Sequence, residues 1–132
     1  MKRIPESYQD LLDDQTKAIA FLATTMTDGS PQVTPVWFNT DGEYILINTA
    51  KGRTKDRNIR SRPQVALAIM DTGSVYRYLQ IRGRVVEITE ENARDHINIL
   101  AGKYTDDAYF ELNSPDEIRV IFKIFPEHVD GH

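Results

Sequence analysis

The apolar and polar positions along this chain, divided by turn-rich segments, predict six strands. The run AIAFLATTM at 18–26 is almost wholly apolar and ends in the turn-rich TDGSP, which is typical of a buried strand. The other expected strands are 32–39, 43–50, 64–71, 76–88 and 118–124. The first three strands are separated only by turns that contain Asp-Gly, so we expect them to form an antiparallel meander.

Three helices are expected beside these strands. Apolar residues at helical spacing near the N-terminus predict a short amphipathic helix with Pro5 in its first turn; they are Ile4, Tyr8, Leu11 and Leu12. Thr54 is expected to cap a helix over 55–61, which must end before Pro63. Thr89 is expected to cap another, whose apolar stripe runs over 93–104.

Two residues inside the expected strands carry extra information. Pro35 cannot donate a ladder hydrogen bond, so it marks an edge strand, a bulge or a place where something other than a strand approaches. Gly83 indicates a bulge or a sharp bend of the kind that barrel closure requires. Six strands with regular turns and few helices favour a mainly β, closed or nearly closed antiparallel barrel.

Composition narrows the class of protein. A chain of 132 residues fits one domain, 1–132. It has no cysteine, which excludes disulfides, thiolate nucleophiles and Cys-based metal sites. No apolar run approaches the length of a membrane span, and the N-terminus lacks the apolar core of a signal peptide, so a cytoplasmic location is expected.

Positive charge is concentrated in one segment of an acidic chain. The net charge is -4, yet six of the twelve residues at 51–62 are Lys or Arg and only Asp56 is acidic. That segment carries +5, so the other 120 residues carry -9. An acidic balance outside one segment argues against a general nucleic-acid surface, which needs phosphate contacts spread over the protein.

The basic segment has two competing interpretations. Its loop leads from a strand to a helix N-terminus, where free N–H groups and basic side chains favour an anion. A phosphate there would be held by Thr49, Arg53, Lys55 and the first helical amides. The alternative is a solvated charged face, with Asp56 and outside acids neutralising it. Nucleic acid is least favoured, because no aromatic residue interleaves with the basic ones.

Residues for acid–base or metal chemistry are few. The three histidines have no metal-ligand spacing, and His96 is expected at the surface or in packing, so no metal site is predicted. Ser30 lies in a turn without a nucleophile elbow. No catalytic residue is assigned, and any chemistry is expected to depend on a bound cofactor.

Aromatic residues offer a second open choice. Tyr76 and Tyr78 stand two apart on one face of the long strand, and Trp37 and Phe38 follow Pro35. They either pack the core or form the walls around a flat ring system whose phosphate reaches the basic helix.

The order of the motifs resembles a known family. From about residue 8 to 129 the chain reads ATTMTDGSPQVTPVWF, YILINTAKGRTKDRNI, a basic residue before Pro, and YRYLQIRGRVVEIT. This resembles the pyridoxamine 5'-phosphate oxidase-like proteins, and within them the class that uses the deazaflavin F420, with relatives that bind FMN. The resemblance implies a six-stranded antiparallel split β-barrel (the FMN-binding split barrel) with a few peripheral helices.

The resemblance also implies a homodimer with two cofactor sites at its interface. The implied cofactor-binding residues are Pro35, Val36, Trp37, Asn48, Thr49, Ala50, Lys51, Arg53, Lys55 and Arg57, with Tyr76 and Tyr78 of the partner subunit beside the ring. The implied activity is hydride transfer from reduced F420, or FMN, to a small unsaturated acceptor. The alternative is a binding or sensing protein without turnover. Pyridoxamine phosphate oxidation is less expected, because the substrate-phosphate and C-terminal residues of the true oxidases find no match.

Overall fold

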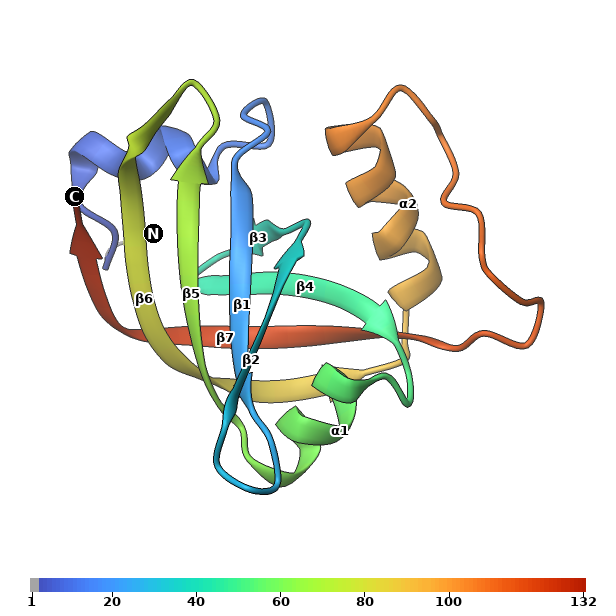
Figure 1. Cartoon of the computed structure of the whole chain (residues 1–132). Helices are drawn as coiled ribbons and strands as arrows, with labels where there is room; N and C mark the ends of the chain where they lie inside the picture. Colours follow the sequence, from blue (N-terminus) through green and yellow to red (C-terminus); the bar gives the residue numbers. More distant parts are fainter. Residues whose placement is uncertain (1–2) are drawn as a thin grey trace.

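The computed structural model describes residues 3–132, which form one strongly curved sheet with helices at its margin (Figure 1). The seven strands of these residues are β1 (Ile19–Thr25), β2 (Pro31–Val36), β3 (Asn39–Asp41), β4 (Tyr44–Ala50), β5 (Gln64–Asp71), β6 (Ser74–Thr89) and β7 (Arg119–Gly131). The helices are the 3₁₀ helix η1 (Glu6–Leu12), α1 (Thr54–Ser61) and α2 (Ala93–Tyr104). No helix among residues 3–132 has the length and apolarity needed to cross a membrane.

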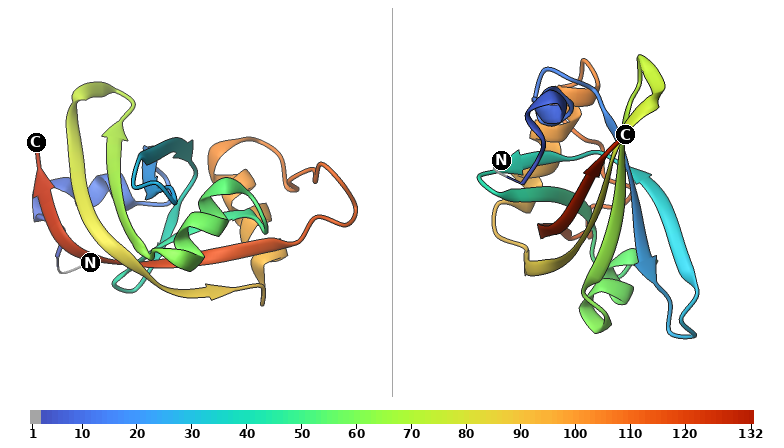
Figure 2. Two further views of the ribbon diagram at one scale, coloured as in Figure 1. Left: turned by 60° about the horizontal axis from the view of Figure 1, so that its bottom comes forward. Right: turned by 90° about the vertical axis from the view of Figure 1, so that its left-hand side faces the viewer.

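The strands follow the order β2-β1-β5-β6-β7-β4-β3, and every neighbouring pair is antiparallel. The two end strands, β2 and β3, are consecutive in the chain and are separated only by Trp37 and Phe38. Helices α1 and α2 lie toward one end of the molecule, and the two chain termini lie at the other (Figures 1 and 2).

The long strand β6 turns the sheet back on itself. Its first part pairs with β5 and its later part with β7, and the β7 register shifts between Arg82 and Gly83. A Cβ added at Gly83 would lie 2.1 Å from the carbonyl oxygen of Phe125. The predicted bulge at Gly83 is therefore confirmed, and its cause is the close approach of β7.

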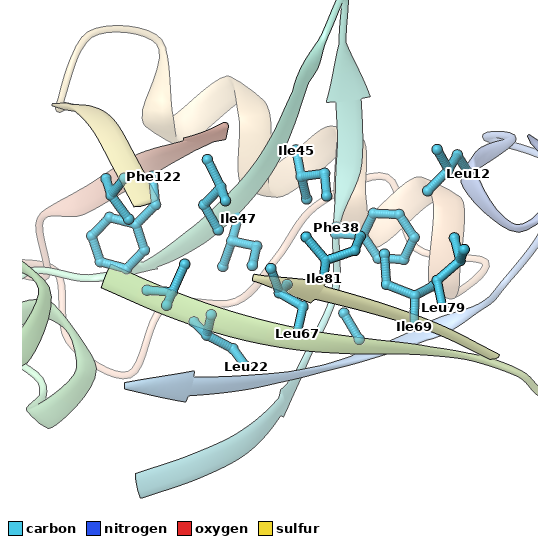
Figure 3. Close-up of a cluster of buried hydrophobic side chains, with 14 of the residues drawn as sticks. Leu12, Leu22, Phe38, Ile45, Ile47, Leu67, Ile69, Leu79, Ile81 and Phe122 are labelled. Atoms are coloured by element: carbon cyan, nitrogen blue, oxygen red, sulfur yellow. The ribbon is translucent and has the colours of Figure 1, made fainter. Parts of the chain in front are cut away.

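Apolar side chains from β1, β4, β5, β6 and β7 fill the space that the sheet encloses (Figure 3). Phe38 and Phe122 are the largest fully buried side chains. Burial alternates along β1, β5 and β7, as a sheet with one face on the core requires. Leu11 and Leu12 of η1 are buried in the same cluster.

Two strand predictions are wrong. The expected strand 32–39 is divided into β2 and β3, because the chain turns at Trp37 and the Phe38 side chain enters the core. The expected three-strand meander is wrong as a whole, because only two antiparallel hairpins of it form, β1 with β2 and β3 with β4. The other edge of β4 pairs with β7, and the other edge of β1 pairs with β5. Periodicity reports which residues are extended and does not report their partners. Pro35 does lie on an edge strand, β2, one of the options predicted for it.

The helix starts also differ from expectation. The first helix is a 3₁₀ helix, and Pro5 is its N-cap, one position before the first turn in which it was expected. Arg53, and not Thr54, is the N-cap of α1. Asn92, with a left-handed φ of 61°, is the N-cap of α2, because Thr89 is still paired with Ile121 in the sheet.

Candidate functional site

A cavity of about 340 Å³ opens between the two ends of the strand order. Its volume lies in the range typical of small-molecule sites. The lining residues come from β1, β2, β4, β7, α1, α2 and the segments beside them: Ile19, Pro35, Val36, Trp37, Asn48, Thr49, Arg53, Lys55, Ile97, Leu100, Phe110 and Arg119. One part of this lining is apolar and the other carries three cations, so the cavity suits an amphipathic anion.

The loop from β4 to α1 directs positive charge at this cavity. Gly52 has a φ of 91°, a left-handed conformation that favours glycine. The buried Asp56 carboxylate accepts hydrogen bonds from the Gly52 N–H at 2.8 Å and from Arg60 Nε at 2.9 Å. The first hydrogen bond within α1 is donated by Arg57 N to Arg53 O, so the preceding helical amides belong to the free N-terminal turn. These amides lie in the same turn as Lys55.

Thr49 supplies an unpaired polar atom at the cavity. Its residue is 1% exposed, it lines the cavity, and its Oγ1 has no hydrogen-bond partner within residues 3–132. A buried hydroxyl without a partner costs on the order of 1–3 kcal/mol. A ligand that accepts a hydrogen bond from this hydroxyl would remove the cost.

Three cationic side chains line the cavity, Arg53, Lys55 and Arg119, and the carboxylate of Glu117 pairs with two of them. Glu117 contacts Arg119 Nη1 at 3.0 Å and Arg53 Nη2 at 3.8 Å. Burial lowers the pKa of Lys55, and the charges of Arg53 and Arg119 lower it further. Burial also lowers the pKa of Arg119. Because these cations repel one another, an anion bound among them would stabilise the charged form of each.

A buried polar chain lies behind Arg119. Arg119 Nε donates to Asn48 Oδ1 at 2.9 Å, and Asn48 Nδ2 donates to Ala93 O at 2.8 Å. Asn48 Nδ2 also lies 3.1 Å from His96 Nδ1, and His96 Nε2 lies 2.8 Å from Asn39 Oδ1. Since Asn48 Nδ2 is a donor and Asn39 Oδ1 an acceptor, this network assigns the neutral tautomer with hydrogen on Nε2.

Aromatic packing fixes one wall of the cavity. Trp37 stacks on Tyr104 with ring centroids 5.5 Å apart, and Phe110 meets it edge-on at 6.2 Å. The Tyr104 hydroxyl donates to Ala18 O at 2.7 Å. Phe38, the neighbour of Trp37, points into the core instead. Trp37 is therefore held in place by Tyr104, which stacks on its ring, and by Phe110, which meets it edge-on.

The structure gathers seven of the sequence-predicted cofactor residues at this cavity: Pro35, Val36, Trp37, Asn48, Thr49, Arg53 and Lys55. Ala50, the next residue of β4, is buried and does not line it. Lys51 is paired with Glu90 at 2.9 Å. Arg57 donates to Gly52 O and to Thr54 Oγ1.

Tyr76 and Tyr78 are not brought to the cavity within one chain. Tyr76 is 89% exposed beside the turn from β5 to β6, and Tyr78 stacks on His132 with centroids 5.1 Å apart. The role expected for them, beside the coenzyme ring, requires that they come from a second subunit, so it stays a prediction. Residues 3–132 contain no cluster of His, Asp or Glu suited to a metal ion.

The sequence interpretation missed Arg119 and Asn39 and left His96 without a polar role. The packing position expected for His96 is what the structure has, and both ring nitrogens are hydrogen-bonded there. The sequence did carry a signal for this network, because Asn48 is an amide that directly follows the apolar residues 44–47 of the expected strand 43–50. A buried amide needs partners, and those partners lie far away in the sequence.

His96 should make the stability of the fold depend on pH. Burial, helped by the Arg119 charge, lowers the pKa of His96 to about 4. An unfolded histidine titrates near pH 6.5, so between these values the unfolded state binds more protons and stability falls as pH falls. From pH 7.5 to pH 5.0 the wild type should lose about 2 kcal/mol more than His96→Gln, measured by urea unfolding. Equal losses in the two proteins would show that His96 is not held neutral.

Several known proteins are similar to the whole chain. The family model described as pyridoxamine 5'-phosphate oxidase matches residues 4–132. A solved structure of an F420 reductase is 32% identical, with a TM-score of 0.82 over 96% of this chain and 98% of that one. No curated protein matches.

Two further solved structures share the fold at lower identity. A putative pyridoxamine 5'-phosphate oxidase from Listeria innocua has a TM-score of 0.71 and 22% identity, and the match covers 96% of this chain and 95% of that one. An FAD-binding protein from Mesorhizobium loti has a TM-score of 0.69 and 21% identity, over 97% and 94% of the two chains. The expected mainly β split-barrel fold is therefore confirmed, with β3 as one strand more than expected.

Proposed function

The chain belongs to the pyridoxamine 5'-phosphate oxidase family, and from that premise we propose that its cavity binds a phosphorylated flavin-type coenzyme. The likeness to an F420 reductase favours reduced F420, with FMN as the second candidate. The proposed activity is hydride transfer to a small unsaturated acceptor.

The observation that carries this proposal is the unpartnered Thr49 hydroxyl beside the cations Arg53 and Lys55. A phosphate placed there accepts from the hydroxyl, the basic side chains and the first amides of α1. At the other part of the lining, Pro35 and Val36 provide an apolar wall for a ring system. The donor set and the wall together fit a coenzyme with a phosphate tail and a flat ring.

The protein's own residues would act mainly by orientation. When bound, the reduced coenzyme supplies the hydride. Thr49, Arg53 and Lys55 anchor its phosphate, and the wall of Pro35 and Val36 limits the positions of its ring and excludes water.

The two polar rings beside the cavity are unsuited to donate a proton to the acceptor. Both His96 nitrogens are engaged with Asn48 and Asn39. Burial raises the pKa of Tyr104 to about 12, and its hydroxyl already donates to Ala18 O. We propose that this proton comes from solvent.

We also propose a homodimer with coenzyme sites at its interface. The outer face of β1, β2, β5 and β6 has a largely apolar groove of about 390 Å³, whose lining includes Phe21, Ala23, Val33 and Ala66. A second copy that covers this groove would bury apolar surface that a monomer leaves in water. The same copy would provide the partner subunit's Tyr76 and Tyr78 beside the ring.

A binding protein without turnover is the second candidate. The observation that favours it is that His96 and Tyr104, the two polar rings beside the cavity, are both engaged in hydrogen bonds to protein atoms. The two candidates share the coenzyme site and differ only in whether an acceptor oxidises the bound coenzyme.

Titration with F420 and with FMN, followed by ring fluorescence, tests the shared part of the proposal. Binding of at least one coenzyme well below about 1 mM is expected, because several charge-assisted hydrogen bonds contribute. Oxidation of reduced F420 by a panel of conjugated acceptors, followed by absorbance, then separates the enzyme from the binding protein. Absence of binding by both coenzymes would refute the proposed function.

A further inference from the structure

We infer that Arg119 is a third cationic ligand of the bound phosphate and that Asn48, His96 and Asn39 position it. This inference rests on the proposed function, because it names a further part of the same site. It concerns residues that no sequence motif singled out as a set, and it follows from their contacts alone.

Arg119 is held rigidly at the edge of the cavity. It is the first residue of β7 and lies opposite Ala50, next to Thr49 on β4. Its side chain is 5% exposed, and Phe110 packs against the guanidinium at 4.9 Å. Within residues 3–132, Nε and Nη1 have protein acceptors and Nη2 has none. The guanidinium therefore keeps a donor for a ligand in the cavity that it lines.

The charge around Arg119 also requires a further anion. Glu117 is shared between Arg119 at 3.0 Å and the more distant Arg53 at 3.8 Å. With Lys55 included, three cations of the cavity face one carboxylate. Arg119 is the buried member of this cluster, and a buried cation is stable only when it is paired and hydrogen-bonded. The phosphate monoester of FMN, with a charge near -2 at neutral pH, would balance this cluster, and the phosphodiester of F420 would supply one of these charges.

The polar chain fixes where the Arg119 donors point. Asn48 directs its amide nitrogen at Ala93 O and His96 Nδ1, so its oxygen is left to accept from Arg119 Nε. This orientation requires an unprotonated His96 Nδ1, and the bond from Nε2 to Asn39 Oδ1 keeps the ring in place. Neutral His96 thus acts on the ligand only through Asn48 and Arg119, as a positioning residue.

Comparison of FMN with riboflavin isolates the phosphate contribution, because the two ligands differ only there. Arg119→Gln should weaken FMN by about 10- to 100-fold and riboflavin by less than about threefold. Arg84→Gln, which removes an exposed positive charge that does not line the cavity, should change neither ligand by more than about threefold.

The positioning role has its own readout. His96→Leu should reduce the preference for FMN over riboflavin by about tenfold, and His96→Gln, which can still donate to Asn39, should restore most of it. A purely structural role would weaken both ligands equally and leave the preference unchanged, which would overturn the positioning role.

Inorganic phosphate provides a test that does not depend on the coenzyme. In a ¹H–¹⁵N NMR titration of the wild type, the Arg119 Nε–H signal should move, and the affinity for phosphate should fall about tenfold in Arg119→Gln. Unchanged phosphate affinity and an unchanged FMN preference in that variant would overturn the inference, although the coenzyme could still bind. If phosphate binds through Arg119 and neither coenzyme binds, the inference stands and the proposed function fails.

Discussion

Replacing Arg53 and Lys55 together with alanine is expected to weaken FMN or F420 binding by about 100- to 1,000-fold. Each side chain lines the cavity beside Thr49 and would donate a charge-assisted hydrogen bond to the phosphate. The fold should change little, because the Arg53 side chain is 46% exposed and its contact with Glu117 is long, at 3.8 Å. Removing Lys55 also relieves its repulsion with Arg53 and Arg119.

Fluorescence titration and thermal unfolding together check this prediction. Lys17→Ala/Arg84→Ala is the matched control, because it removes two exposed positive charges that do not line the cavity. The control should bind within about threefold of the wild type. Equal affinities of the wild type and the Arg53/Lys55 variant would show that the phosphate lies elsewhere.

Gly83→Ala should destabilise the fold by about 3 kcal/mol, the largest effect that we expect from a single methyl group. The added Cβ would lie 2.1 Å from Phe125 O and 3.1 Å from Phe125 C, so backbone atoms of β7 must move. That movement would disturb the bulge in the part of β6 that pairs with both β5 and β7. For a domain of this size the midpoint of thermal unfolding should fall by about 10 °C.

Gly102→Ala is the control for this substitution. Gly102 lies in α2, and nothing lies within 4 Å of a Cβ built there. Alanine at that helical position should stabilise the protein by up to about 1 kcal/mol. A Gly83→Ala protein as stable as the wild type would mean that β6 and β7 do not approach as closely as described.

Local sequence signals predicted much of the fold. Turn residues and alternation located the strands around β1, β4, β5 and β7, and Gly83 marked the bend. The same signals failed at Phe38, where one buried ring ends a run that still reads as a strand. They also failed for pairing, because the contact of β4 with β7 joins residues about seventy positions apart. Such pairing is decided by the whole core and leaves no local mark.

The residues of the site likewise fall into a group that the sequence predicted and a group that it did not. Thr49, Arg53 and Lys55 were predicted because they lie together on one strand–loop–helix segment. Arg119 and the polar role of His96 were missed because these residues reach Asn48 from β7 and α2, which the sequence separates from it by 71 and 48 positions. Residues in one local segment share a local signal, whereas a buried network is visible only after folding.

The most direct test of the coenzyme site is a crystal structure of the protein with FMN or F420 bound. The phosphate should lie within hydrogen-bonding distance of Thr49 Oγ1 and Lys55 Nζ, with the ring against Pro35 and Val36. A coenzyme bound instead in the outer groove beside Phe21 and His128, with the Thr49 hydroxyl still unpaired, would contradict the account.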